Sequence, residues 1–245
     1  MAFKHLEDNL EDEHVLPYLE FYRELQEPTR TVLGYALDIA SYLDAQGLSE
    51  KYAIFGGYAV LSHLISAFGD SVAKVWRGST DIDMGGNHTV LNSIRSDYHM
   101  SNDLPSPNIP HKRTLKLDTT GENECKIDFY LGNPDEKYGD SRINSHFGIP
   151  LRVVKPEFII RNKVYTPENE LHHYGDILAM ISVLEKEDYA SEQIIKILTH
   201  EQSTELQKRI VRAEKEFSKD RFGFFPGKRF TDDLKRALRS HRALN

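Results

Sequence analysis

The sequence predicts an α+β protein in which a mixed sheet, flanked by helices, is followed by a helical C-terminal domain. Two helical patterns come first, strand and helix patterns then alternate to about residue 131, and helical patterns alone continue beyond about residue 150. This order separates a sheet-containing core from an all-helical region. We expect a core over residues 1–150, with the N-terminal helices included, and a helical domain over residues 151–245 that ends in a basic tail.

Hydrophobic periodicity and turn residues define the elements of the core. The second of two N-terminal helices has apolar residues at helical spacing and stops at Gly47. Gly56-Gly57 separates the first strand from the helix after it, and a loop rich in Pro and Asn at 102–110 precedes an antiparallel hairpin with a turn at 118–123. In order, we expect helices at about 14–26 and 29–46, a strand at 51–55, a helix at 58–68, a strand at 80–84, a helix around 90–94, and strands at 113–117 and 124–131.

The second half of the chain shows helical periodicity without strand patterns. Apolar Ile177, Leu178, Ile181 and Leu184 mark the buried stripe of one helix. A soft domain boundary is placed near Pro150. The expected helices lie at about 156–164, 171–186, 191–200, 203–219 and 231–242.

The composition is that of a soluble globular protein, with 245 residues of which 39% are hydrophobic. The longest apolar stretches, 52–61 and 177–184, fall short of the roughly 20 residues that span a bilayer, so no membrane partner is expected. The N-terminus is acidic where a secretory signal would be basic and then apolar. We therefore expect a cytoplasmic protein.

Cysteine and histidine give no metal site of their own. Cys125 is the only cysteine, which excludes an intramolecular disulfide and a thiolate-rich zinc site. It shares its parity with Ile127 and Phe129, so we expect it to be buried on a strand. His172 and His173 are adjacent and would point about 100° apart on a helix, so they do not converge on one ion.

The net charge of −7 conceals a basic tail. Residues 207–245 hold 12 Lys or Arg against 5 Asp or Glu, a balance of +7, which leaves −14 for the rest of the chain. Such a tail suits contact with phosphates, and the alternative is a solvated helix face. Its interleaved phenylalanines could stack on a nucleic-acid strand or belong to the core. They are Phe217, Phe222, Phe224, Phe225 and Phe230.

Two carboxylates share one face of the expected strand at 80–84. The period of two puts Asp81 and Asp83 on one side and Ile82 and Met84 on the other. Adjacent carboxylates repel one another unless a cation lies between them, and oxygen ligands suit Mg²⁺ or Mn²⁺. The alternative is an acidic, solvated strand face.

Gly56-Gly57 favours the metal interpretation. Glycine lets the backbone approach a ligand closely, and amides at the start of the following helix present donors to a triphosphate. The alternative is an ordinary tight turn. Asp128 alternates with Ile127 and Phe129 on its own strand and can face the same cleft as Asp81 and Asp83. Three such groups could hold two metals, one on the phosphates and one lowering the pKa of an attacking hydroxyl.

These motifs carry a resemblance to a known family. The segments 55–60, FGGYAV, and 77–83, RGSTDID, look like the signature of the DNA polymerase beta superfamily. The second segment is similar to that of the AbiEii-like toxin nucleotidyltransferases, which include the MenT-type toxin–antitoxin enzymes. The resemblance covers about residues 50–200 and implies a polymerase-beta-like nucleotidyltransferase core. The longer gap before Asp81 requires an added loop at 69–75.

The resemblance also implies the roles of individual residues. Lys163 would bind phosphates, and its alternative is a solvated lysine. Asp176 would assist the acceptor hydroxyl or position a helix, and its alternative is a carboxylate favoured by a helix dipole. Arg77 would steady a phosphate or hold the loop before the metal strand. The implied nucleotide-binding residues are Gly56, Gly57, Arg77, Thr80 and Lys163, the metal ligands are Asp81, Asp83 and Asp128, and the catalytic residues are these aspartates with Lys163 and Asp176.

The function expected from sequence is metal-dependent transfer of a nucleoside monophosphate from a nucleoside triphosphate, such as ATP, to an acceptor hydroxyl. By resemblance the acceptor could be the 3′ end of a tRNA or another RNA, and the protein a toxin of a toxin–antitoxin or phage-defence system with a cognate antitoxin. Two alternatives belong to other classes: a non-catalytic binding protein that keeps the fold, and a metal-dependent phosphodiesterase that uses water as the nucleophile.

Overall fold

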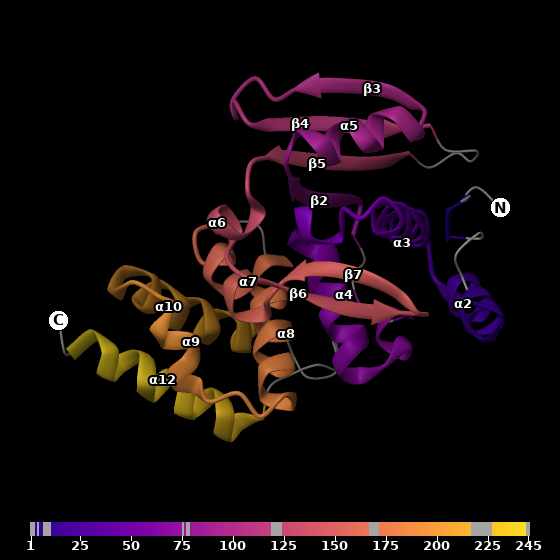
Figure 1. Ribbon diagram of the computed structural model, residues 1–245. Coiled ribbons are helices and arrows are strands. Elements are labelled where there is room, and N and C mark those ends of the chain that lie inside the picture. Colours follow the sequence, from indigo (N-terminus) through magenta and orange to yellow (C-terminus); the bar gives the residue numbers. More distant parts are fainter. Residues whose placement is uncertain are drawn as a thin grey trace. The chain divides into compact units, whose positions relative to one another are not determined.

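The computed structural model describes residues 3, 5–6, 11–74, 76, 79–118, 124–166, 172–216 and 227–243. Contacts between Cα atoms divide the chain into two compact units, Met1–Val154 and Lys155–Asn245. The boundary expected near Pro150 falls inside a strand of the first unit, since Pro150 belongs to Ile149–Val154. The predicted α+β class is confirmed, with a mixed sheet, flanking helices and a helical C-terminal region (Figure 1).

The first unit holds one seven-stranded sheet in the order β3-β4-β5-β2-β1-β7-β6. The pairs β2–β5 and β1–β7 are parallel, and the other neighbours are antiparallel. Its elements are α2 (Asp12–Glu24), α3 (Thr29–Ala45), η1 (Ser49–Lys51), β1 (Tyr52–Phe55), α4 (Gly56–Phe68), η2 (Asp70–Lys74), β2 (Asp81–Gly86), α5 (His88–Asp97), β3 (Met100–Pro105), β4 (Lys112–Leu117), β5 (Cys125–Leu131), α6 (Pro134–Tyr138), β6 (Ser141–His146) and β7 (Ile149–Val154).

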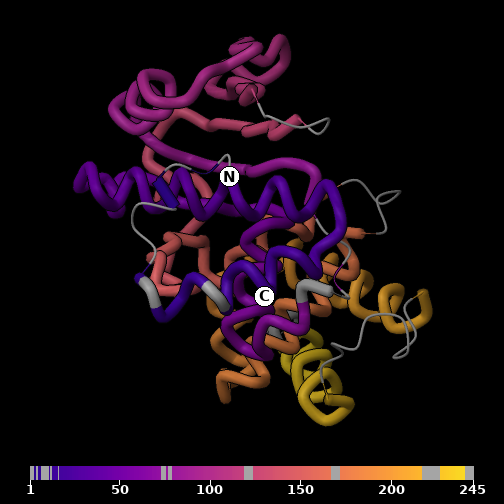
Figure 2. The backbone as a smooth tube through the Cα atoms, turned by 90° about the vertical axis from the view of Figure 1, so that its right-hand side faces the viewer, coloured from indigo at the N-terminus to yellow at the C-terminus, as the bar shows by residue number. Residues whose placement is uncertain are grey.

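The apolar face of the central strands packs against helices. Ile82 and Met84 of β2 are fully buried, whereas the alternating Asp81 and Asp83 are partly exposed, so the predicted period of two is confirmed. Cys125 is buried on β5, as predicted. Helix α3 is buried along most of its length, contacts β2, β5 and β7, and runs alongside the strands in Figure 2. One face of the sheet is thereby covered, and the carboxylates lie on the other.

Three strand segments were not predicted. The prediction of a loop at 102–110 is wrong in part, because the residues up to Pro105 belong to the edge strand β3, where a proline is tolerated. The hairpin of β6 and β7 was missed because β6 inverts the usual pattern, with Asn144 and His146 buried and Ile143 exposed. The added loop expected at 69–75 contains the short 3₁₀ helix η2.

A buried polar network joins β6 to α4. Ser62 and His63 of α4 are at most 1% exposed. The Asn144 amide donates to Ser62 Oγ at 2.9 Å, and Ser62 Oγ is hydrogen-bonded to His146 Nε2 at 2.7 Å. Asn144 and Arg142 also donate to His63 Nδ1, at 3.2 and 2.9 Å, while His63 Nε2 donates to the carbonyl of Val154 at 2.7 Å. The two donors that face Nδ1 hold the His63 imidazole neutral.

This network predicts a loss of stability in acid. Burial, together with the nearby Arg142 charge, lowers the pKa of His63 to about 3, and burial lowers the pKa of His146 to about 4. The unfolded chain binds these protons from about pH 6.5 downward and the folded chain does not, so stability is full above pH 6.5 and falls as the pH decreases. Each histidine contributes a slope of about 1.4 kcal/mol per pH unit.

Urea unfolding at pH 7 and pH 5 measures the effect. The parent is expected to lose roughly 4 kcal/mol of unfolding free energy between these values through the two histidines. His63→Gln should show a smaller loss, and His88→Gln, at an exposed position on α5, should keep the parental loss. Parallel pH curves for His63→Gln and the parent would contradict the buried-neutral assignment.

The second unit is helical in every element that the structure describes. Its helices are α7 (Pro156–Lys163), α8 (His172–Lys186), α9 (Ser191–Lys196), α10 (His200–Glu216) and α12 (Lys228–Ala243). The predicted helices in this region are confirmed in kind, and the one expected at 191–200 ends at Lys196. Helix α12 packs against α9 and α10 through buried Leu234 and Leu238. Among the described helices, none is both long and apolar enough to cross a bilayer.

Candidate functional site

Register brings the three predicted carboxylates to one face of the sheet. Strand β5 lies parallel to β2, with Asp128 opposite Asp83 and Lys126 opposite Asp81. Partners in register point to the same side of a sheet, so these four side chains share the face opposite to α3 and α5. The prediction that Asp128 faces the same side as Asp81 and Asp83 is confirmed in geometry.

Asp83 lies against the glycine turn. Phe55, the last residue of β1, is opposite Asp83, and α4 begins directly afterwards at Gly56. A Cβ atom at Gly56 would lie 2.0 Å from Asp83 Oδ2, and the φ of Gly56 is +68°. Both observations require glycine, since any side chain would collide with the carboxylate and the backbone is left-handed. The turn therefore lets the carboxylate reach the N-terminal end of α4.

Two lysines and a threonine hold Asp128. Lys112 Nζ donates to Oδ2 at 2.7 Å, Lys126 Nζ donates to the same oxygen at 2.9 Å, and Thr114 Oγ1 donates to Oδ1 at 2.9 Å. Burial alone would raise the pKa of Asp128, but hydrogen bonds from Lys112, Lys126 and Thr114 outweigh it and lower this pKa. Asp128 is thus a firmly ionised carboxylate and a weak proton acceptor.

Lys126 also reaches Asp81, with 3.3 Å between Nζ and Oδ2. A lysine that links two carboxylates offsets the repulsion that the sequence pattern predicts. Burial opposes the charged form of both lysines, yet hydrogen bonds to Asp128 raise the pKa of Lys126 and of Lys112. The face therefore carries fixed charges of both signs.

The residues fit a hard divalent cation at Asp81 and Asp83. Both carboxylates are partly exposed, alternate on one rigid strand and offer oxygen ligands, which suits Mg²⁺ or Mn²⁺ with further ligands from substrate. Asp128 differs, because both of its oxygens accept short hydrogen bonds from lysine or threonine, whereas the Lys126 contact of Asp81 is longer, at 3.3 Å. The structure thus favours Asp81 and Asp83 as the cation ligands and Asp128 as the anchor for lysines.

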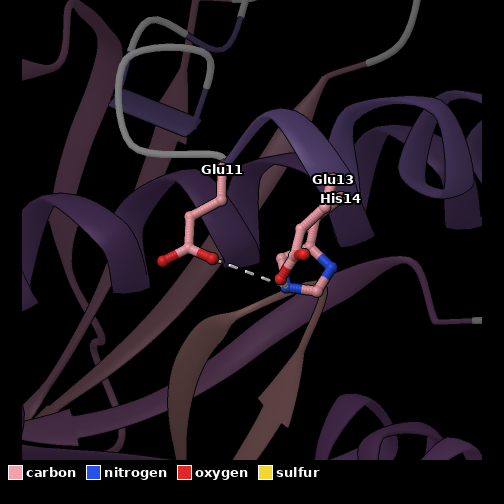
Figure 3. A group of neighbouring side chains, drawn as sticks. All are labelled: Glu11, Glu13 and His14. Carbon is pink, nitrogen blue, oxygen red and sulfur yellow. Dashed lines mark ion pairs between the residues drawn. The ribbon is translucent and has the colours of Figure 1, made fainter.

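Within the described part of the chain, only Glu11, Glu13 and His14 bring ligand atoms from three such residues within 4.8 Å of one another. Figure 3 shows this group, and His14 Nε2 lies 3.9 Å from Glu11 and 3.6 Å from Glu13. Both glutamates are about three-quarters exposed. Solvated carboxylates beside a histidine form a surface ion pair, so this group offers no shielded cation site.

An aromatic cluster borders Asp83. The rings of Phe55 and Tyr138 stack with centroids 3.9 Å apart, and Tyr130 meets Phe55 at 5.3 Å. Lys137 Nζ lies 4.9 Å from the centroid of the Tyr130 ring. Burial and the Asp83 charge raise the pKa of Tyr130. The aromatic rings and the Lys137 ammonium therefore border one side of the carboxylate site.

In the second unit, Lys163 and Asp176 are paired with each other. Lys163 Nζ lies 2.7 Å from Asp176 Oδ2 and 3.0 Å from His173 Nδ1, and Asp176 is fully buried. Lys163 is 8% exposed, so the alternative of a solvated lysine is wrong. Buried Arg209 of α10 donates to the carbonyls of Lys163 and Thr166, which ties α10 to the end of α7. The pair links α7 to α8.

Removing one member of this pair should destabilise the second unit. Asp176→Asn leaves a buried ammonium without its counter-charge, which typically costs about 3–5 kcal/mol of unfolding free energy. Urea denaturation measures this loss. The double variant Lys163→Met/Asp176→Leu should recover most of it, because buried ion pairs exchange for apolar pairs at small cost. An unchanged midpoint for Asp176→Asn would refute the structural role of the pair.

Other predicted residues are placed differently. Thr80 is exposed immediately before β2, and Arg77 lies outside the described residues. In the basic tail, Lys235 contacts Glu214 at 2.7 Å and Arg236 contacts Asp233 at 3.1 Å, whereas Lys228 and Arg229 are exposed. Of the tail phenylalanines, Phe230 is half-buried and the others lie outside the described residues.

Sequence reasoning missed Lys112, Thr114 and the bridging role of Lys126. The shared parity of Lys126, Asp128 and Tyr130 was visible in the sequence and could have suggested a cation beside the carboxylates. Which carboxylates it meets depends on the β2–β5 register, and the contact of Lys112 depends on the β4–β5 register, where Lys112 is opposite Tyr130. These pairings are not local and carry no sequence signal of their own.

Comparison with known proteins gives structural neighbours and no sequence relatives. The sequence matches no protein family, and no curated protein matches it. The chain is similar to an antigenic nucleotidyltransferase-like protein from Paracoccidioides brasiliensis, with 19% identity, a TM-score of 0.47, and coverage of 88% of this chain and 94% of that chain. It is also similar to the antibiotic-resistance factor ANT(2'')-Ia, with 15% identity, a TM-score of 0.33, and coverage of 89% and 96% respectively. The function is therefore inferred from the carboxylate site.

Proposed function

We propose that the protein transfers a nucleoside monophosphate from a nucleoside triphosphate to an acceptor hydroxyl. The observation that carries this proposal is the position of Asp83, whose carboxylate shares a strand face with Asp81 and lies against Gly56 at the start of α4. A cation on these carboxylates and the amides of a helix N-terminus would face the same triphosphate. Phosphoryl-type transfer depends mainly on positioning and charge neutralisation, which such groups provide.

In the proposed reaction, the acceptor oxygen forms a bond to the α-phosphorus. The bond from this phosphorus to the oxygen bridging the β-phosphate breaks, pyrophosphate leaves with the electron pair, and the hydroxyl proton passes to solvent. Mg²⁺ or Mn²⁺ held by Asp81 and Asp83 would neutralise phosphate charge and polarise the acceptor hydroxyl. Asp128 lies opposite Asp83 and holds Lys112, which would add a positive charge on the same sheet face as the anionic substrate.

The acceptor that we propose is RNA, with the 3′ end of a tRNA as the first candidate. This choice rests on the resemblance of segments 55–60 and 77–83 to the toxin nucleotidyltransferases and on the basic charge of the tail. The same resemblance supports action as a toxin with a cognate antitoxin partner. Lys163 as a phosphate ligand and Asp176 as an aid to the acceptor remain predictions from this resemblance, and both would have to leave the ion pair that they form.

Incubation with each of four triphosphates labelled at the α-phosphate, with and without total RNA, tests the proposal. Transfer of label to RNA or to the protein supports nucleotidyl transfer and identifies the base and the acceptor. Breakdown of RNA without transfer would favour a phosphodiesterase. No reaction with any triphosphate, while the protein remains folded, would favour a non-catalytic binding protein.

A further inference from the structure

The lysine that bridges Asp81 and Asp128 contacts one of the two carboxylates at which a divalent cation is expected to bind. Lys126 Nζ lies 3.3 Å from Asp81 Oδ2 and 2.9 Å from Asp128 Oδ2. Lys126 is opposite Asp81 in the β2–β5 register, and Asp128 follows on the same face of β5. The bridge is therefore a direct consequence of strand pairing. An ammonium in this position and a divalent ion on Asp81 would repel one another.

Lys112 and Lys126 differ in how firmly they are held. The Lys112 side chain is 18% exposed, lies 2.7 Å from Asp128 and rests over the Tyr130 ring with Nζ 5.2 Å from its centroid. The Lys126 side chain is 37% exposed, and its two contacts are longer. Asp128 also accepts from Thr114, so it keeps two donors if Lys126 leaves. Lys126 is thus the cation that can exchange without leaving a buried charge unpaired.

The charge balance also favours an exchange. The carboxylates of Asp81, Asp83 and Asp128, set against the ammonium groups of Lys112 and Lys126, leave one net negative charge among these five groups. This excess of carboxylate charge opposes the approach of a triphosphate. A divalent ion reverses the sign, and an ammonium released from Asp81 is then drawn to the incoming phosphates.

We propose that Lys126 is an exchangeable counter-ion, whose ammonium holds Asp81 and Asp128 in the ligand-free protein and moves to the triphosphate when a divalent cation takes its place. This inference rests on the proposed nucleotidyl transfer at the same site. It assigns the mobile phosphate contact to Lys126 of β5, whereas Lys163 is held by Asp176. Metal and triphosphate binding become coupled, because each favours the same displacement of Lys126.

Lys126→Met tests the exchange, since it keeps the aliphatic stem and removes the charge. The affinity for Mn²⁺ in the absence of nucleotide should rise roughly threefold to tenfold, because the competing ammonium is gone. Electron paramagnetic resonance of free Mn²⁺ measures this affinity. Binding of a non-hydrolysable triphosphate analogue at saturating Mn²⁺ should weaken by about tenfold, because a phosphate contact is lost. Lys126→Arg, which keeps a positive charge, should return both affinities toward the parent values.

Lys116→Met is the matched control. Lys116 is opposite Lys126 in the β4–β5 register, its side chain is also 37% exposed, and it pairs with Glu124 at 2.6 Å instead of with the carboxylate site. Both affinities should stay at the parent values in this variant. Mn²⁺ binding that is unchanged or weaker in Lys126→Met would overturn the exchange, and unchanged analogue binding would overturn the phosphate contact.

These outcomes are separable from failure of the proposed function. A parent that binds Mn²⁺ and the analogue with the expected Lys126 effects, but transfers no label, would retain the exchange and lose nucleotidyl transfer. Mn²⁺ binding that appears only in Lys126→Met would show that the Lys126 ammonium excludes Mn²⁺ from the parent, which supports the exchange. If neither protein binds Mn²⁺, the exchange is overturned together with the metal site.

Discussion

Asp83→Asn is expected to lower nucleotidyl transfer by about a thousandfold, the scale on which loss of one charge-stabilising group acts in an active site. The substitution keeps the shape of the side chain and removes the charge that would bind the cation. Because Asp83 shares its strand face with Asp81, neutralising it should leave the unfolding free energy unchanged or slightly higher. Initial rates with labelled triphosphate, together with thermal unfolding, measure both quantities.

Glu124→Gln provides the control for this variant. Glu124 precedes β5, its side chain is 63% exposed, and it pairs with Lys116. Its loss should leave transfer at the parental rate. Asp81→Asn should repeat the effect of Asp83→Asn on transfer. Full activity of a folded Asp81→Asn/Asp83→Asn double variant would rule out cation binding at β2 as the basis of catalysis.

Gly56→Ala is expected to lower transfer by about a hundredfold or more and to destabilise the first unit by about 1–2 kcal/mol. The added Cβ would lie 2.0 Å from Asp83 Oδ2, so the carboxylate must move away from the start of α4. The left-handed backbone adds strain of its own, since the φ of Gly56 is +68°. Transfer kinetics and urea unfolding separate the two effects.

Gly47→Ala is the control that has the backbone strain of a left-handed residue without a collision with Asp83. Gly47 has nearly the same φ, +67°, and a Cβ there would meet no atom within 4 Å. It should therefore lose similar stability and keep parental transfer. If Gly56→Ala and Gly47→Ala show equal transfer rates, Gly56 serves the turn alone and the approach of Asp83 to α4 has no role in catalysis.

The elements that local patterns define were predictable from the sequence. The alternation of β2, the glycine turn before α4 and the parity of β5 all follow from the strand period and from the conformational freedom of glycine, and the structure keeps each of them. The carboxylate face of the sheet therefore follows from residues close together in the chain. The role of Gly56 was only partly predictable, because its close approach to Asp83 joins the start of α4 to β2.

The rest depends on pairings that no local pattern records. Strand β6 is stabilised by a buried network, so its inward face carries Asn144 and His146 instead of apolar residues. The bridge from Lys126 to Asp81 exists only because β5 pairs with β2 in one register. Burial of Lys163 depends on α8, which supplies Asp176. Charged residues that appear solvated in sequence can thus be held in ion pairs by tertiary structure.

Transfer of α-phosphate label to RNA by the parent, Asp83→Asn and Glu124→Gln, assayed side by side with Mg²⁺, tests nucleotidyl transfer at this site most directly. The predicted result is labelled RNA and free pyrophosphate with the parent and with Glu124→Gln, and about a thousandfold less with Asp83→Asn. Equal labelling by all three proteins would contradict the assignment of the reaction to the carboxylates of β2.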